Sequence, residues 1–274
     1  MVYLIYSAVS YPFLGIFSMS SGILRAGGNT KAPMRASVIS NIVNAAVGAL
    51  CIYLLDLGVA GAGMALLFSR ITGAGVLFLV LLRPEKDIGI KKITFRLEKG
   101  IIWPVLKIGV PASIDGLVFN GGKLLVQTFI TGLGTVALGA NSIANSMTGL
   151  ISIPGNTVSL VAVTIIGQAV GAGIYGKNLR KEITILNLYS IALLTVMSAV
   201  LFPLLPFVLD LYVPPVEVKN LTLSILNIML LVMPFTWPPA FVLPSCLRST
   251  GDSLFVTVVS IISMWLTRVL GSWY

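Results

Sequence analysis

The sequence contains no histidine and only two cysteines. Histidine is the most common metal ligand and the usual proton-transfer group near neutral pH, so its absence argues against both kinds of site. Cys51 and Cys246 are isolated and lack the CxxC spacing of metal and redox sites, which favours small buried side chains. The sequence therefore predicts no catalytic residue, no metal site and no cofactor.

Charged residues are also scarce. They make up 10% of the chain, whereas soluble domains carry roughly 25%. Hydrophobic residues make up 57%, the mean hydropathy is +1.00, and no charged residue lies between Lys123 and Lys177. A bilayer can hold so long an uncharged stretch, because about 20 apolar residues span its hydrocarbon core. We predict an all-α integral membrane protein, a multi-pass helical bundle in contact with lipid.

The net charge of +9 comes from basic residues grouped in short segments. These residues lie at 25–35, 83–107, 171–182 and 247–253. The segments between them, 57–60, 132–135 and 210–218, contain no basic residue. The positive-inside rule places the four basic segments on the cytoplasmic side of a plasma membrane. This topology accounts for the charge without a nucleic-acid partner.

Eight helices of membrane-spanning character are expected. We place them at 2–22, 34–56, 61–82, 107–131, 136–170, 183–209, 219–246 and 254–273. The fifth is too long for one straight span, so Pro154-Gly155 should kink it, unless it opens with a turn that does not span. Residues 83–106 have a soluble-like composition and predict a cytoplasmic linker between lobes 1–82 and 107–274.

A short motif occurs twice. Leu24-Arg25-Ala26-Gly27-Gly28-Asn29 recurs as Leu247-Arg248-Ser249-Thr250-Gly251-Asp252, each time between two predicted spans. An even number of spans separates the copies, so both point the same way, as in the parallel repeats of some transporters. With six helices per repeat, the chain would cover helices four to eleven of twelve. We therefore expect an internal piece whose partners are missing N-terminal helices of the same protein, and a monomer.

Several motifs resemble those of the multidrug and toxic compound extrusion (MATE) family, within the larger group of multidrug, oligosaccharidyl-lipid and polysaccharide exporters. They are Leu24-Arg25-x-x-Gly28-Asn29-Thr30-x-x-Pro33-Met34, Gly58-x-x-Gly61-Ala62-Gly63, Gly109-Val110-Pro111-Ala112, Leu133-Gly134-Thr135-x-Ala137-Leu138-Gly139-Ala140, Ile166-Gly167-Gln168-Ala169-Val170-Gly171 and Leu247-Arg248-x-x-Gly251-Asp252. The resemblance implies export of drugs, organic cations or metabolites in exchange for Na⁺ or H⁺, by alternating access between two six-helix lobes.

Polar residues within a span are costly, so each is a candidate for function. Asp115 is the only acidic residue expected within the hydrocarbon region, and it could bind Na⁺ or a proton. It could instead reach the cytoplasmic mouth or cap a break at Pro111. It lies nearer the cytoplasmic end than the ion-binding carboxylate of many family members.

The same span carries three further polar candidates, Asn120, Lys123 and Gln127, which share one helical stripe. Asp115 lies about 12 Å from Lys123 along the helix, too far for a direct ion pair. Some family members use an acidic residue on the first helix, which this chain does not contain. Gln127 stands at the position that repeat symmetry assigns to that acid, and an amide can bind substrate but cannot carry a proton.

Other candidate cavity residues lie on three further spans. They are Asn141, Asn145 and Thr148, then Asn41 and Asn44, and finally Trp237 and Phe241 beside Pro238-Pro239. The polar residues fit either a cavity lining or interhelical hydrogen bonds. The aromatic pair could stack on a planar or cationic drug, or belong to a kinked packing helix.

Two alternatives to a drug antiporter remain open at this point. One is a flippase for lipid-linked oligosaccharides or polysaccharides from the same superfamily, although such a cavity should contain more arginine and lysine than Lys123, Arg70 and Arg268. The other is an inactive membrane fragment. An enzyme is disfavoured, because the sequence offers no paired acids, histidine or phosphate loop.

Overall fold

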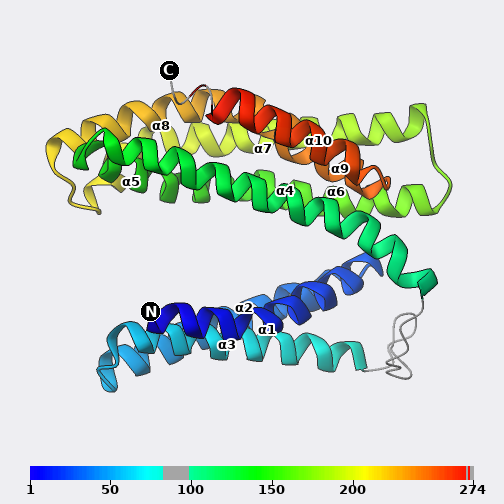
Figure 1. The fold of residues 1–274 in the computed structure, drawn as a ribbon, viewed down its shortest axis with the longest axis horizontal. Helices are drawn as coiled ribbons and strands as arrows, with labels where there is room; N and C mark the ends of the chain where they lie inside the picture. The colour runs from blue at the N-terminus through cyan, green and yellow to red at the C-terminus, as the bar shows by residue number, and fades with distance from the viewer. Residues whose placement is uncertain (83–98, 270, 272–274) are drawn as a thin grey trace. The chain divides into compact units, whose positions relative to one another are not determined.

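The computed structural model describes residues 1–82, 99–269 and 271, and every regular element in these ranges is helical. The chain divides into two compact units, Met1–Arg96 and Leu97–Tyr274. Figure 1 shows the helices of each unit running nearly parallel or antiparallel to one another. The all-α fold predicted from the sequence is confirmed.

The first unit is a bundle of three helices. They are α1 (Val2–Ala26), α2 (Lys31–Ala49), extended by the π-helical turn η1 (Leu50–Leu54), and α3 (Gly58–Leu82). Its apolar core joins all three helices through Leu24, Ala36, Leu77 and Leu81. The Ser40 hydroxyl donates to the backbone oxygen of Ser69 at 2.7 Å and ties α2 to α3.

The second unit contains the remaining helices. They are α4 (Lys99–Gly132), α5 (Thr135–Ile151), α6 (Ile153–Gly171), α7 (Lys177–Asp210), α8 (Val216–Trp237), the π-helical turn η2 (Pro238–Val242), α9 (Leu243–Ser249), α10 (Ser253–Ser263) and η3 (Met264–Val269). One core cluster joins α5, α7 and α8, and a second joins α6, α7, η2 and α9. Helix α4 packs mainly along α10 and η3, and η2 is enclosed by α6, α7, α8 and α9.

The outward faces of these helices are apolar. Leu117, Leu124 and Phe207 are each more than 70% exposed, among many other large hydrophobic residues. In the described ranges, seven helices are long and apolar enough to cross a membrane: Val2–Ala26, Lys31–Leu54, Gly58–Leu82, Ile102–Gly132, Ile153–Gly171, Lys177–Asp210 and Val216–Ser249. Lipid accommodates such surfaces and water does not, so the protein is a multi-pass membrane protein.

Two predicted spans differ in the structure. The predicted helix 136–170 is divided at Ser152 into α5 and α6. Pro154 lacks a backbone N–H and its ring crowds the carbonyl four residues before it, which explains a break beside the proline. The predicted helix 254–273 begins as α10 (Ser253–Ser263) and continues as the π-helical η3 (Met264–Val269), and residues 270, 272 and 273 of the predicted range lie outside the described residues. Of the predicted linker 83–106, residues 83–98 lie outside the described ranges, and 99–106 form the first turns of α4.

The two copies of the repeated motif have the same backbone geometry. Gly28 and Gly251 both have positive φ, +86° and +95°, which favours glycine. The Gly28 amide donates to the oxygen of Arg25 at 2.9 Å, and the Gly251 amide donates to the oxygen of Arg248 at 3.1 Å. Each copy ends one helix and leads into the next, as the repeat predicts.

Candidate functional site

One face of α4 carries side chains that reach other helices of the second unit. Asp115, Phe119, Lys123 and Gln127 follow one another at intervals of four residues. Residues four apart are neighbours on a helix surface, and the direction drifts by only about 40° per step. This inner face of α4 (residues 115, 119, 123 and 127) is the candidate functional site.

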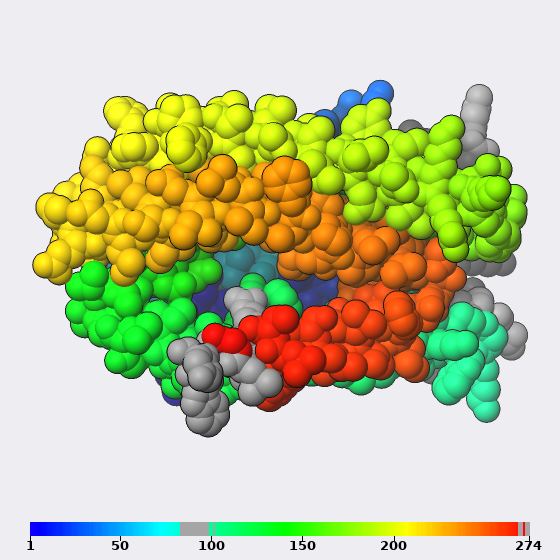
Figure 2. Space-filling view, turned by 90° about the horizontal axis from the view of Figure 1, so that it is seen from above, coloured from blue at the N-terminus to red at the C-terminus, as the bar shows by residue number. Residues whose placement is uncertain are grey.

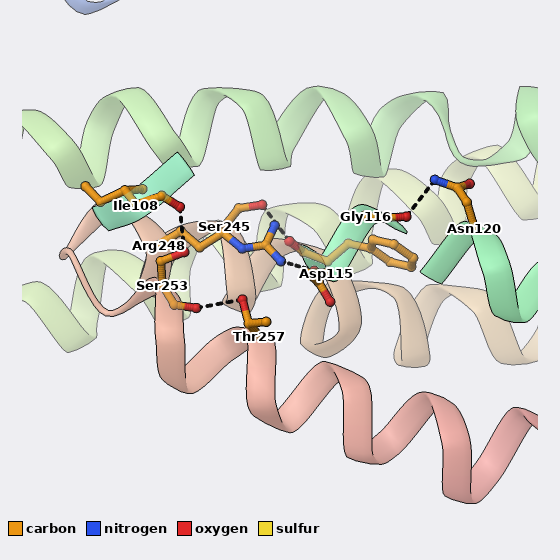
Figure 3. A network of polar contacts seen from close by, with 9 residues as sticks. Ile108, Asp115, Gly116, Asn120, Ser245, Arg248, Ser253 and Thr257 are labelled. Atoms are coloured by element: carbon orange, nitrogen blue, oxygen red, sulfur yellow. Dashed lines mark hydrogen bonds and ion pairs between the residues drawn. The ribbon is translucent and has the colours of Figure 1, made fainter. Parts of the chain in front are cut away.

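The N-terminal half of the inner face carries an ion pair. Asp115 accepts a hydrogen bond from Nη2 of Arg248 on α9, and the two side chains are 16% and 30% exposed. Close by, the Ser253 hydroxyl donates to the oxygen of Ile108 at 3.0 Å. Figure 3 shows this network joining α4, α9 and α10. The Arg248 Nε is buried without a hydrogen-bond partner in the described part of the chain.

The sequence did not predict this pair. It assigned Asp115 to ion coupling and Arg248 to a structural motif, and these two residues are 133 positions apart. Arg248 now has two roles, because its backbone closes the turn at Gly251 and its side chain neutralises Asp115.

The middle of the inner face is aromatic and cationic. Phe119 meets Phe241 edge to face with ring centroids 6.2 Å apart, and Trp237 stacks on Phe241 at 4.0 Å. The Lys123 ammonium lies 4.9 Å from the centroid of the Phe119 ring, within the range of a cation–π contact. Sequence reasoning missed Phe119, although its place midway between Asp115 and Lys123 was a usable signal.

The aromatic pair Trp237 and Phe241 is presented by an irregular stretch of helix. The π-helical turn η2 (Pro238–Val242) follows α8 directly and contains both Pro238 and Pro239. A π-helical turn places one extra residue in the helix and is frequent at functional sites. A Cβ added to Gly155 on α6 would lie 2.5 Å from the Trp237 ring, so the bare glycine makes room for that indole.

The far end of the inner face carries amides. The Asn141 side-chain amide on α5 donates to Oε1 of Gln127 at 2.9 Å. Both side chains are half-buried. This contact joins two of the predicted cavity residues across helices.

The other predicted site residues are not gathered at this face. Asn120 is exposed and donates to the oxygen of Gly116 on its own helix, at 2.8 Å. Thr148 bonds within α5 and touches the sulfur of Met229 at 3.5 Å. Asn145 is exposed.

In the first unit, Asn41 is exposed and Asn44 donates to the Ser69 hydroxyl at 3.5 Å. Among the predicted motif residues, Pro33 is buried near the start of α2, and Pro111 lies within α4. Arg25 is half-buried at the end of α1.

Figure 2 shows a hollow in the surface of the second unit. It opens between the orange helix α8, the green helices α4 and α5, and the red helix α10. The inner face of α4 contacts three other elements of this unit, namely α5 through Asn141, η2 through Phe241 and α9 through Arg248. Small-molecule sites in helical bundles commonly lie between helices in this way.

Comparison with known proteins gives consistent matches. The family model described as MatE matches residues 1–50 and 111–274. The "Probable multidrug resistance protein NorM" of Thermotoga maritima is 24% identical over 93% of this chain and 55% of its own length. The "Probable multidrug resistance protein YoeA" of Bacillus subtilis is 22% identical over 94% of this chain and 57% of its own length. The chain spans about half the length of these relatives.

Solved structures show the same fold. A MOP superfamily transporter from Pyrococcus furiosus aligns with a TM-score of 0.83 and 19% identity over 99% of this chain and 61% of that one. A mutant of the Vibrio cholerae MATE transporter VcmN aligns with a TM-score of 0.83 and 16% identity over 98% of this chain and 60% of that one. The helix order described above is therefore a known transporter architecture.

Proposed function

The chain belongs to the MatE family, multidrug and toxic compound extrusion transporters, and from this we propose that the full-length protein is a secondary active antiporter. It exports drugs, organic cations or other metabolites in exchange for Na⁺ or H⁺, by alternating access. The observation that supports an antiporter best is a carboxylate, Asp115, held within a candidate membrane span and paired with Arg248 of α9.

Asp115 is the coupling residue in this proposal. A carboxylate oxygen binds Na⁺ or a proton, and Arg248 already occupies that oxygen. The incoming cation therefore competes with the guanidinium for the same acceptor. Because Arg248 lies on α9, which directly follows η2, its release breaks the link between α4 and α9 and lets the helices rearrange.

The protein acts in the plasma membrane, with the basic segments on the cytoplasmic side. Arg25, Lys31 and Arg35 lie at one turn of the first unit, and Lys177, Arg180 and Lys181 lie at the start of α7. Attachment of an impermeant label to single cysteines placed at Gly176 or Leu133 in intact cells tests this orientation. We expect labelling from outside at residue 133 and none at residue 176, and the opposite pattern would reverse the topology.

Gradient-driven transport tests the proposed function. The full-length protein is reconstituted in vesicles, and a panel of aromatic dyes of positive, zero and negative charge is tested against imposed Na⁺ and H⁺ gradients. At least one dye should cross the membrane in the direction opposite to the flow of the cation, and its transport should stop when an ionophore collapses the cation gradient. If no dye responds to either gradient, while the protein is folded and correctly inserted, the antiporter proposal fails.

A further inference from the structure

Lys123 is a charged side chain in the middle of the inner face of α4 with no ion-pair partner among the described residues. Its ammonium lies over the Phe119 ring at 4.9 Å, and its side chain is exposed. Asp115 is eight residues away, about 12 Å along the helix axis. That carboxylate is already paired with Arg248, so it does not neutralise Lys123.

The remaining carboxylates in the described part of the second unit lie at helix ends. Glu182 and Asp210 lie near the two ends of α7, Glu217 is in the first turn of α8, and Asp252 caps α10. Asp210 is paired with Lys219. Among the charged side chains of the inner face, Asp115 is paired with Arg248 and Lys123 has no ion-pair partner in the described residues. The middle of the inner face is therefore electrically positive.

A cluster of aromatic side chains lies directly beside this charge. Phe119 is under the ammonium, Phe241 meets Phe119 edge to face at 6.2 Å, and Trp237 stacks on Phe241 at 4.0 Å. One helical turn further along α4, Gln127 and Asn141 present side-chain amides. The arrangement combines one positive charge, an aromatic wall (Phe119, Phe241 and Trp237) and neutral hydrogen-bonding groups.

The first unit shows the same charge balance by itself. Arg70 lies in the middle of α3, donates to the Ser10 hydroxyl at 2.6 Å, and lies 5.4 Å from the centroid of the Tyr11 ring. Asp56, the only acidic residue among positions 1–82, lies between η1 and α3 at the end of the spans. Each unit thus carries a cation in mid-span against an aromatic ring, and neither cation has a carboxylate partner in the described ranges.

We propose that the inner face of α4 binds an organic anion with a flat aromatic body. The carboxylate or sulfonate of the ligand accepts hydrogen bonds from Lys123, and its ring lies along Phe119 and Phe241. The inference rests on the proposed function and narrows it, since it selects anionic metabolites or drugs among the molecules that the antiporter could export. A hydrogen bond from an ammonium to an anionic oxygen is charge-assisted, and such bonds are roughly twice as strong as those between neutral groups.

Equilibrium binding to the full-length protein tests this inference without any transport step. The probes are radiolabelled 1-naphthalenesulfonate and the cation 1-naphthylmethylammonium, which share one ring system. Binding is measured by equilibrium dialysis against nanodiscs of zwitterionic lipid, with empty nanodiscs as the blank. We expect the sulfonate to bind about tenfold or more tightly than the ammonium compound, as charge-assisted hydrogen bonding predicts.

Three substitutions of one residue and a matched control sharpen the test. Lys123→Gln should weaken sulfonate binding about tenfold or more, Lys123→Arg should retain it, and Lys123→Glu should reverse the preference between the two probes. Lys107→Gln removes an exposed lysine from the same helix and should leave both affinities unchanged. Lys123 is exposed in the structure, so these variants should fold, which their thermal unfolding checks.

Three results overturn the inference. They are tighter binding of the ammonium probe, a sulfonate affinity unchanged within twofold in Lys123→Gln, or no binding of either probe by a folded protein. Each result leaves gradient-driven transport untouched, because transport of a cationic or neutral dye remains a separate measurement. Failure of the antiporter proposal and failure of the anion inference are therefore distinguishable.

Discussion

The turn after α1 and the turn after α9 have similar backbone geometry, but their arginine side chains have different partners. In both, an arginine is the second-last residue of the helix, and the amide of a glycine with positive φ donates to the arginine oxygen. In the second unit the arginine side chain, Arg248, pairs with Asp115 on α4. In the first unit, Asp56 is the only acidic residue among the described positions 1–82, and it does not pair with Arg25.

This difference separates what the repeated motif does for folding from what it does for function. The turn needs only the glycine and the helix end, so both copies keep it. In the described residues only the arginine of the second turn, Arg248, has a carboxylate partner, so a coupling role is expected at this turn. The same substitution made at matching positions of the two copies should therefore have equal effects on the free energy of unfolding and unequal effects on transport.

Removal of the carboxylate should have the largest effect. Asp115→Asn should reduce cation-driven export to the leak of empty vesicles, because an amide cannot exchange a cation. The free energy of unfolding should fall by somewhat less than the roughly 3–5 kcal/mol seen for fully buried pairs, since both side chains are partly exposed. Export by reconstituted vesicles and unfolding in detergent measure the two effects.

The exposed pair of Asp210 and Lys219 supplies the matched control. Asp210→Asn removes the carboxylate of the last residue of α7. An exposed ion pair of this kind contributes at most about 1 kcal/mol to the free energy of unfolding. Export by this variant should equal that of the unsubstituted protein. Full export by Asp115→Asn would remove Asp115 from the mechanism.

Two glycines that leave room for aromatic rings extend the comparison. A Cβ at Gly155 would lie 2.5 Å from Trp237, and a Cβ at Gly63 in the first unit would lie 2.7 Å from Tyr6. Gly155→Ala and Gly63→Ala should each lower the free energy of unfolding by about 1–3 kcal/mol, because the rings must move. Only Gly155→Ala should also weaken naphthalenesulfonate binding, since Trp237 stacks on Phe241. Equal effects on binding would show that the aromatic wall is not part of the site.

The two turn glycines provide the test of equal effects. Gly28→Ala and Gly251→Ala place a Cβ on a left-handed residue, which costs about 1–2 kcal/mol in each case. Gly15→Ala is the control, because this helical glycine has open space around its Cβ position. Thermal unfolding of the three variants measures the costs. A cost at Gly251 several times that at Gly28 would mean that the Arg248 pair depends on the turn.

The amide contact should have the smallest effect. Replacement of Gln127 and Asn141 by alanine, singly and together, gives a double-mutant cycle for the contact between α4 and α5. Interhelical hydrogen bonds in membranes contribute about 0.6 kcal/mol on average, and the coupling energy should be of that size. A coupling energy near zero would show that the 2.9 Å contact does not hold the two helices together.

Local features were the ones that the sequence could predict. The helix ends at Arg25 and Arg248 depend on a glycine a few residues away, so the repeat and its turns could be recognised. The division of the long predicted helix near Pro154 also follows from a local cause, although the structure places it at Ser152. The all-α membrane fold follows from the uncharged stretches.

Contacts between distant segments could not be predicted. Asp115 and Arg248 are 133 positions apart, and nothing in the sequence between them fixes which face of α9 meets α4. The same holds for Phe119 and Phe241, because helix faces are matched only when the whole bundle packs. Asn120 falls on the predicted polar stripe of α4, yet its side-chain amide donates a hydrogen bond within its own helix. The types of candidate residue were predictable, and their partners were not.

The most direct test of the coupling proposal is the concentration of Na⁺ or H⁺ that gives half-maximal export in the Arg248→Gln variant. If the coupling cation competes with the guanidinium for Asp115, removal of Arg248 strengthens cation binding. The half-maximal concentration should then fall about tenfold or more, as expected when a carboxylate loses an adjacent positive charge. An unchanged or higher half-maximal concentration would contradict competition between Arg248 and the cation at Asp115.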